Sequence, residues 1–263
     1  MPVITVSSAQ GPRSAQEDRV IAATIRAAGR AGGHLIALFD GHRGAEVAQR
    51  ASETAVGLFQ DALNRRSDDP AGAFGDLFAA LVEGSRRRLA GSTASLFFFR
   101  DGGGPAWAAS LGDSPIATVD GGGHFVFAAG HNVRYNLRER SAATARGAIY
   151  SDGYIFDGRD PQTGLQMSRS LGDGDLDAIL DRRPEIQVVT LGPRSAGFVG
   201  SDGLLGPMED HQATLTRLLQ RVQAGAEADD LVSDALERST GDNVSAAVWR
   251  LSATSRTNPT AHW

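Results

Sequence analysis

The stretch LIALFDGHRG, residues 35–44, decides how the rest of the chain is interpreted. Its five leading apolar residues predict a strand buried on both faces, because a half-exposed strand would alternate apolar and polar residues. A carboxylate, a glycine and an imidazole (Asp40, Gly41 and His42) follow directly, where a rigid element can hold a functional group in place. The alternative is that Asp-Gly only forms the turn after a strand, as these residues often do.

The composition is that of an ordinary globular protein. The chain has 263 residues, of which 41% are hydrophobic and 22% are charged, so it can bury a sizeable core without covalent staples. The absence of cysteine excludes disulfides, thiolate metal sites and thiol nucleophiles. All the basic residues are arginine, which excludes Schiff-base chemistry and a P-loop lysine.

The charge and the N-terminal sequence argue against two classes of partner. The formal charge is −5 and no basic block is present, so we expect no nucleic-acid partner. No run approaches the ~18–20 apolar residues of a membrane span, and the sequence starts without the pattern of a signal peptide. We therefore expect a cytoplasmic protein that does not associate with a membrane.

Apolar spacing predicts strands and helices in an alternating order. The predicted strands cover residues 3–8, 19–26, 35–39, 92–100, 105–111, 115–119, 124–128, 186–191, 196–200 and 244–251. The predicted helices cover residues 45–66, 71–90, 210–222 and 227–237. Residues 131–146 suit a short arginine-rich helix, and residues 151–164 suit a loop with one strand. This order predicts layered sheets with helices outside, in one domain over residues 1–252, followed by a disordered tail over 253–263.

Acidic residues recur in one local setting, beside an apolar run and next to Gly or Ser. Besides Asp40, they are Glu17, Asp18, Asp113, Asp173, Asp202 and Asp242. Each one alone could be a turn residue. Several carboxylates that converge would repel one another unless a shared cation neutralises them. A ligand set of oxygens favours Mg²⁺ or Mn²⁺ over zinc and leaves Ca²⁺ open.

Seven short motifs, in order over residues 5–250, resemble those of the metal-dependent protein phosphatases of the type 2C family, in their bacterial form. They are Arg13-x-x-x-Glu17-Asp18, Phe39-Asp40-Gly41-His42, Gly91-Ser92-Thr93-Ala94, Leu111-Gly112-Asp113-Ser114, Ser168-Arg169-Ser170-Leu171-Gly172-Asp173, Ser201-Asp202-Gly203 and Gly241-Asp242-Asn243. The resemblance implies an α+β fold, with a central β-sandwich of two antiparallel sheets flanked by helices. It also implies a binuclear metal centre at one edge of the sandwich.

The resemblance also implies a set of metal ligands. Asp40 would bridge two Mn²⁺ or Mg²⁺ ions, and Asp202 and Asp242 would complete the shell of one of them. Glu17 and the carbonyl of Gly41 would serve the other ion. By the same resemblance, Asp113 would share a third, weaker ion with Asp202.

The catalytic roles are implied in the same way. Asp18 would orient the attacking water, and Arg13 would bind the phosphate, for which its planar guanidinium is suited. His42 would protonate the leaving serine or threonine oxygen. Asp173 matches a motif of the family, and we interpret it as structural.

These assignments predict a Mg²⁺- or Mn²⁺-dependent serine/threonine protein phosphatase. Its partners would be phosphorylated proteins and a cognate Ser/Thr kinase. Two alternatives stay open: hydrolysis of small phosphoesters, and an inactive pseudophosphatase that binds phosphoproteins. Three departures from the family pattern, at Arg43, Pro115 and Leu204-Leu205, affect substrate contacts rather than ligands. Residues 130–165 lie where the family carries a variable flap, so substrate choice is expected there.

Overall fold

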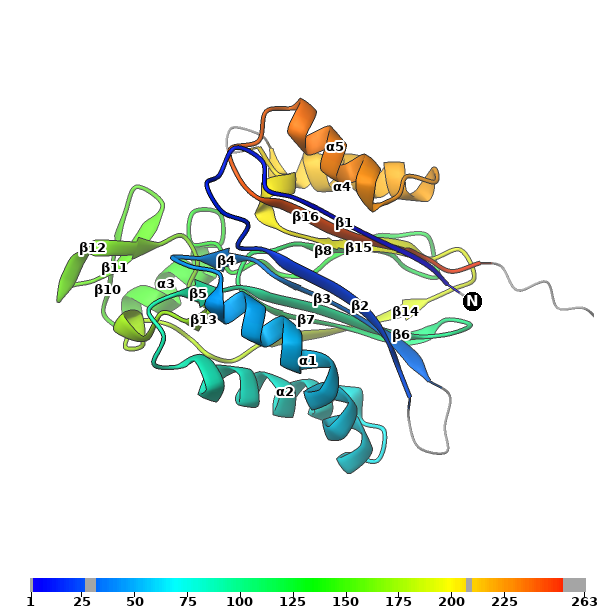
Figure 1. Ribbon diagram of the computed structural model, residues 1–263, viewed down its shortest axis with the longest axis horizontal. Helices are drawn as coiled ribbons and strands as arrows, with labels where there is room; N and C mark the ends of the chain where they lie inside the picture. The colour runs from blue at the N-terminus through cyan, green and yellow to red at the C-terminus, as the bar shows by residue number, and fades with distance from the viewer. Residues whose placement is uncertain (1, 27–31, 207–209, 253–263) are drawn as a thin grey trace, which may run out of the picture.

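The computed structural model describes residues 2–26, 32–206 and 210–252. Two antiparallel sheets lie face to face at the centre of the molecule, and helices cover both outer faces (Figure 1). The predicted disordered tail, residues 253–263, lies outside the described residues.

Each central sheet has five strands. In spatial order, the first sheet contains β1 (Val3–Ala9), β16 (Val244–Arg250), β15 (Ala196–Gly200), β8 (Ile116–Val119) and β9 (Phe125–Phe127). The second sheet contains β14 (Glu185–Leu191), β7 (Gly104–Leu111), β6 (Ala94–Arg100), β3 (Gly33–Phe39) and β2 (Arg19–Ile25). These strands agree with the sequence prediction to within a few residues at each end.

Two pairs of helices complete the layers. α1 (Glu46–Arg65) and α2 (Pro70–Ser85) pack on the second sheet, and α4 (His211–Gln223) and α5 (Ala228–Glu237) pack on the first (Figure 1). This arrangement confirms the predicted α-β-β-α sandwich. Among the helices of the described residues, none has both the length and the apolar composition needed to cross a membrane.

The five apolar residues that open the deciding stretch form β3, and all of them are fully buried. Leu35 and Phe39 belong to the core between the second sheet and its helices. Ile36 and Leu38 belong to the core between the two sheets, where Trp249 stacks on Phe97 with ring centroids 5.1 Å apart. A strand with a helix layer on one face and a sheet on the other needs apolar residues at every position, which explains the unbroken run.

The structure corrects two predictions of secondary structure. Residues 148–165 form a three-stranded antiparallel sheet, β10 (Ala148–Ser151), β11 (Tyr154–Asp157) and β12 (Asp160–Leu165), where a loop with one strand was predicted. These strands are short and most of their residues are not buried, so burial imposes little apolar periodicity on their sequence. α2 ends at Ser85 rather than at residue 90, and the arginine run after it therefore lies outside the helix.

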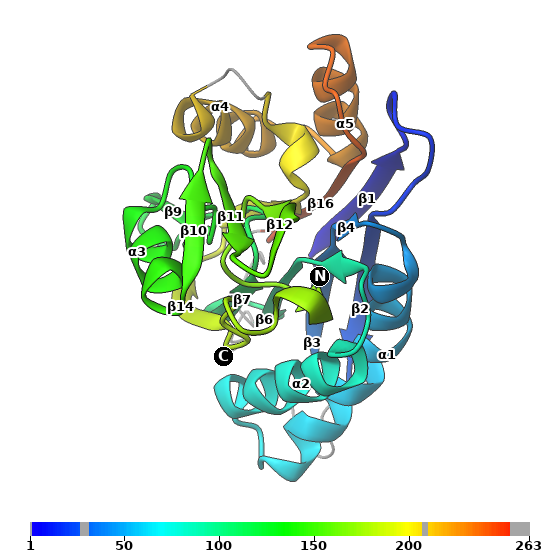
Figure 2. The ribbon, with the colours of Figure 1, turned by 90° about the vertical axis from the view of Figure 1, so that its left-hand side faces the viewer.

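The three-stranded sheet belongs to a subdomain that sits at one end of the sandwich (Figure 2). It also contains α3 (Leu137–Ala145) and has its own small core, in which Val133 and Ile155 contact Leu176 and Ile179. The strands β3, β7 and β15 end one or two residues before Asp40, Asp113 and Asp202. We call residues 130–183 the flap; the variable segment expected from the sequence, residues 130–165, is the first part of it.

We expect the core between the sheets to contribute strongly to the stability of the fold. Val199 on β15 is fully buried there, whereas Val188 on β14 is 57% exposed. Val199→Ala should lower the free energy of unfolding by about 2 kcal/mol, because it removes two buried methyl groups and leaves a cavity. Val188→Ala, the matched control, should change it by less than about 0.5 kcal/mol. Urea denaturation measures both values, and equal effects at the two positions would contradict the assigned core.

Candidate metal centre

Strand register brings the acidic residues to one end of both sheets. In the second sheet, Arg19 pairs with Phe39 and Ala94 pairs with Leu111, so the starts of β2 and β6 lie at the same end of the sheet as the ends of β3 and β7. In the first sheet, Gly200 pairs with Ala246, so the end of β15 lies beside the start of β16. Each predicted site carboxylate lies in a segment that enters or leaves a strand at this end.

Asp40 directly follows β3 and is held by two backbone hydrogen bonds. Its amide donates to Thr93 Oγ1 at 3.1 Å, and the amide of Thr93 donates to the Asp40 carbonyl at 2.9 Å. The Thr93 hydroxyl also shares a hydrogen bond of 2.8 Å with the Ser114 hydroxyl, beside Asp113. Thr93 therefore fixes Asp40 relative to the loop that carries Asp113.

The Glu17–Asp18 loop packs against Gly41 and is tied to the other sheet by Asn243. A Cβ on Gly41 would lie 2.6 Å from the Glu17 carbonyl oxygen, so only glycine allows this approach. Asn243 Oδ1 accepts a hydrogen bond from the Glu17 amide at 2.9 Å, and its Nδ2 donates to the carbonyls of Gln10 and Ala15 at 2.8 Å each. The backbone of Glu17 thus lies directly against Gly41.

Asp242 sits at the open side of the centre with Arg13. Arg13 Nη2 donates to Asp242 Oδ2 at 2.6 Å, and Arg13 Nε donates to the Gly241 carbonyl at 2.9 Å. Asp202 follows β15 and begins a short 3₁₀ helix, Asp202–Leu204. The structure therefore places Arg13 at the centre, where it pairs with a predicted metal ligand.

Asp113 joins the centre to the flap. Its Oδ2 accepts a hydrogen bond of 2.7 Å from Asn132 Nδ2. Asn132 forms an isolated β-bridge with Met167, so the same residue connects two segments of the flap to the sandwich. Movement of the flap would therefore displace the Asp113 side chain through its hydrogen bond with Asn132.

The pKa values show how strongly the carboxylates act on one another. Burial raises the pKa of Asp40 well above its usual value, and the charges of Asp18, Asp202, Asp113 and Asp242 add to this effect. Burial raises the pKa of Asp202 to about 8, and Asp113, Asp242 and Asp18 act in the same direction. Burial also raises the pKa of Asp18, against hydrogen bonds from Ser245 and Ser201. The five carboxylates form one electrostatic unit with excess negative charge.

Two buried oxygens of this unit have no hydrogen-bond partner among the described residues, namely Asp18 Oδ2 and Asp113 Oδ1. Buried polar atoms are rarely left without a partner, so a missing ligand is indicated. Within the described part of the chain, no group of three or more acidic or imidazole side chains is already closed around one point. The hard oxygen donors and their excess charge nevertheless suit Mg²⁺ or Mn²⁺.

His42 lies on β4 (Gly41–His42) beside the carboxylate unit, and its ring contacts Asp173. Burial raises the pKa of Asp113, and the charge of His42 is among the effects that oppose this shift. Sequence reasoning assigned no role to Thr93, Asn132 or Asn243, although Thr93 and Asn243 stand inside quoted motifs. No motif in the sequence marked Asn132, because its contact with Asp113 joins the flap to the sandwich and depends on the three-dimensional fold.

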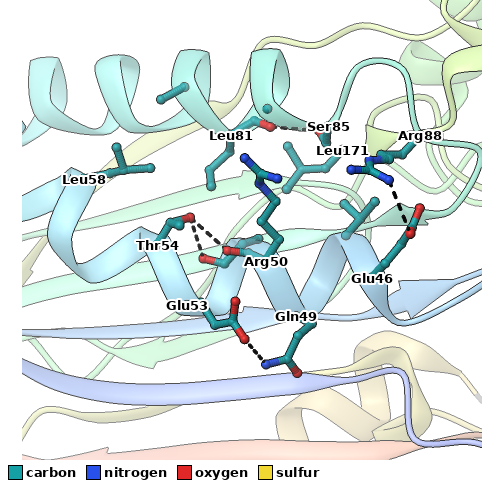
Figure 3. A pocket seen from close by; sticks show the side chains of 14 residues that line it. Glu46, Gln49, Arg50, Glu53, Thr54, Leu58, Leu81, Ser85, Arg88 and Leu171 are labelled. Carbon is teal, nitrogen blue, oxygen red and sulfur yellow. Dashed lines mark hydrogen bonds and ion pairs between the residues drawn. The ribbon is translucent and has the colours of Figure 1, made fainter.

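Two cavities lie in different parts of the structure, one at the end of the sandwich that carries the carboxylates and one beside its helices. A cleft of 830 Å³ lies between the flap and the carboxylates, and Arg13, Asp113, Asp202 and Asp242 line it together with Tyr135. A second cavity of 560 Å³ lies between α1 and α2, where Arg50, Leu81 and Ser85 point into it (Figure 3). The described lining of this second cavity contains none of the predicted site residues.

The sequence matches the family described as Protein phosphatase 2C over residues 3–244. A rice protein (Oryza sativa subsp. japonica) named "Probable protein phosphatase 2C 41" is 29% identical over 227 residues, which cover 82% of this chain and 76% of that protein. An Arabidopsis thaliana protein named "Protein kinase and PP2C-like domain-containing protein" is 25% identical over 229 residues. That match covers 82% of this chain but 34% of the Arabidopsis protein, so the chain spans about a third of that relative.

Solved structures share the fold at low sequence identity. The serine-threonine phosphatase 2C from Toxoplasma gondii superposes with a TM-score of 0.73 at 23% identity, covering 94% of both chains. The catalytic domain of the serine threonine protein phosphatase PstP, in complex with two manganese ions, superposes with a TM-score of 0.58 at 19% identity. The latter match covers 95% of this chain and 98% of that one.

The electrostatic unit predicts an unusual pH dependence for the metal-free protein. Burial and the neighbouring carboxylates raise the pKa of Asp202 in the folded protein to about 8, above the ordinary aspartate pKa of 3.8. The folded state thus binds more protons than the unfolded state between these pH values, so stability should fall as pH rises through this window. Asp202→Asn should flatten this fall and should make the chelator-treated protein more stable than the wild type at about pH 9.

Thermal denaturation at a series of pH values, in the presence of a chelator, measures this effect. Asp61→Asn, an exposed change on α1, is the matched control and should leave the pH dependence unchanged. Each kcal/mol should shift the melting temperature by about 2–4 °C in a chain of this size. A wild-type protein whose metal-free stability rises between pH 5 and pH 8 would show that the carboxylates do not repel one another as described.

Proposed function

The chain belongs to the protein phosphatase 2C family, and from this premise we propose that it is a serine/threonine protein phosphatase that depends on Mn²⁺ or Mg²⁺. The observation that carries the proposal is the set of five carboxylates at one end of the sandwich, in which burial and the charges of the neighbouring carboxylates raise the pKa of Asp40 and Asp202. We further propose that residues 1–252 form a single catalytic domain.

We propose that two ions bind this set. Asp40 would bridge them, Asp202 and Asp242 would hold one, and Glu17 and the Gly41 carbonyl would hold the other. A third ion would lie between Asp113 and Asp202, where Asp113 Oδ1 has no partner in the described structure. Such ions neutralise phosphoryl oxygens and make water a nucleophile near neutral pH.

The remaining site residues would bind the substrate and move protons. Arg13, which is exposed at the mouth of the cleft, would donate its N–H groups to the phosphate oxygens. Asp18 would orient the attacking water, for which its Oδ2 is available. His42 would give a proton to the serine or threonine oxygen as the P–O bond breaks, because an alkoxide is a poor leaving group.

The shape of the cleft favours a phosphorylated protein over a small phosphoester. It has a volume of 830 Å³, and its rim includes the exposed side chains of Tyr135 and Leu137 on the flap. A phosphoserine side chain occupies a small part of such a volume, so flanking peptide residues have room to bind. A kinase that phosphorylates the same proteins would be the functional partner of this chain.

A pseudophosphatase that binds phosphoproteins is the second candidate. It is favoured by one observation: the carboxylates of the described residues approach one another without closing around a single point. The two candidates differ in one property, which is turnover of a phosphopeptide.

The test is hydrolysis of a phosphothreonine peptide after chelation and after return of Mn²⁺. We expect no release of phosphate by the chelated protein, restoration by Mn²⁺, and no restoration in the folded variant Asp242→Asn. Asp61→Asn again serves as the control and should behave as the wild type. Full activity without metal would contradict the proposed metal centre. Binding of the peptide without any turnover would identify a pseudophosphatase, and turnover of small esters alone would exclude a protein substrate.

A further inference from the structure

The imidazole of His42 is held by a carboxylate that lies outside the metal centre. His42 Nε2 is 2.8 Å from Asp173 Oδ2 and 3.0 Å from Asp173 Oδ1, so both carboxylate oxygens face one ring nitrogen. The side chain of Asp173 is 0% exposed, and that of His42 is 21% exposed. The pair therefore runs from the interior of the protein outward, with the imidazole at the outer end.

Short strands and hydrogen bonds fix Asp173 in this position. It follows β13 (Leu171–Gly172), which pairs with β5 (Gly91–Ser92), and β5 pairs in turn with β4, which carries His42. Asp173 has a left-handed backbone, with φ 46° and ψ 50°, a conformation that a non-glycine residue adopts only when its surroundings impose it. Ser170 Oγ donates to Asp173 Oδ2 at 2.7 Å, and the Asp173 amide donates to the Ala90 carbonyl at 3.2 Å.

Gly91 lies directly against the contact between the two side chains. A Cβ at this position would lie 2.1 Å from Asp173 Oδ2 and 2.2 Å from His42 Nε2. The absence of a side chain at Gly91 is therefore a condition for the histidine–aspartate contact. This position also offers a way to separate the pair without changing the charge of either partner.

The nearby arginine is occupied by a different carboxylate. Arg43 donates to Asp175 through Nη1 at 3.0 Å and Nη2 at 2.7 Å, and it approaches Asp173 Oδ1 only at 3.4 Å. The close partners of the Asp173 carboxylate are thus the His42 ring and the Ser170 hydroxyl. A buried carboxylate arranged in this way stabilises an imidazole that carries a proton on Nε2.

We propose that Asp173 is a positioning residue for His42: it holds Nε2, so that Nδ1 is the nitrogen that gives its proton to the leaving oxygen. This inference rests on the proposed phosphatase function. As the bond between phosphorus and the serine or threonine oxygen breaks, the proton on Nδ1 moves to that oxygen, and the alcohol leaves. Neutral His42 keeps its Nε2 proton on Asp173 and takes back a proton on Nδ1 from solvent.

The proposal differs from a purely structural role in what it predicts for two leaving groups. An alkoxide needs a proton in order to leave, whereas the phenolate of p-nitrophenyl phosphate leaves without one. A positioning residue should therefore affect the phosphoserine reaction selectively. A residue that only supports the fold should affect both reactions alike and should lower the melting temperature.

The experiment compares kcat on a phosphoserine peptide and on p-nitrophenyl phosphate for Asp173→Asn, Gly91→Ala, His42→Ala and the double variant His42→Ala/Asp173→Asn. On the peptide, we expect about a 100-fold or larger loss for His42→Ala. For Asp173→Asn and Gly91→Ala we expect about 10- to 100-fold losses. The double variant should lose no more than His42→Ala, because the two residues act as one unit. All should hydrolyse the aryl ester at nearly the wild-type rate.

Asp175→Asn is the matched control, since it makes the same change two residues away and contacts Arg43 instead of His42. It should leave both reactions unchanged. Equal losses on the two substrates, or additive losses in the double variant, would overturn the role of Asp173 and leave the phosphatase function standing. A wild type that hydrolyses neither substrate would instead overturn the proposed function.

A measurement on the metal-free wild type tests the contact between His42 Nε2 and Asp173 without any turnover. We expect nuclear magnetic resonance to show a slowly exchanging His42 Nε2–H proton, which Gly91→Ala and Asp173→Asn both lose. Its absence from the wild type would overturn the proposal, even if the variants failed to fold.

Discussion

Repulsion among carboxylates at one end of the sandwich is the constraint on which the site depends. Burial alone disfavours the charge on Asp40 and Asp202, and each charge makes the others more costly. A protein that gathers acidic groups in this way loses stability when it is empty and regains it when cations bind. The rigid strands β3, β7 and β15 hold the groups together against this repulsion, because their buried side chains belong to the cores on both faces of the sheets.

The fold could be predicted in large part from the sequence. The apolar run of residues 35–39 indicated a strand buried on both faces, and the structure shows Leu38 facing a sheet and Phe39 facing helices. The flap was the exception, since β10, β11 and β12 were interpreted as a loop with one strand. Few of their residues are buried, and these pack in a small separate core around Ile155, so neither run length nor alternation reveals the strands.

The candidate site shows a different limit of sequence reasoning. Motif order indicated which carboxylates belong together, and strand register explains why they meet: the pairs Arg19–Phe39 and Gly200–Ala246 bring both sheets to the same end. The motifs did not predict which side chains from distant segments contact the site residues, because a motif describes only a local stretch of sequence. Asn132 reaches Asp113 from the flap, and Asp173 reaches His42 across one intervening short strand, β5. Asp173 was therefore interpreted as structural, and its carboxylate proved to face the predicted general acid.

The central claim is that this end of the sandwich is a centre for divalent cations. The most direct measurement is anomalous diffraction from crystals of the wild-type protein grown with Mn²⁺. The account predicts the strongest anomalous peaks about 2.0–2.6 Å from the carboxylate oxygens of Asp40, Asp202 and Asp242. Crystals that contain Mn²⁺ but show no anomalous peak at these carboxylates would contradict it.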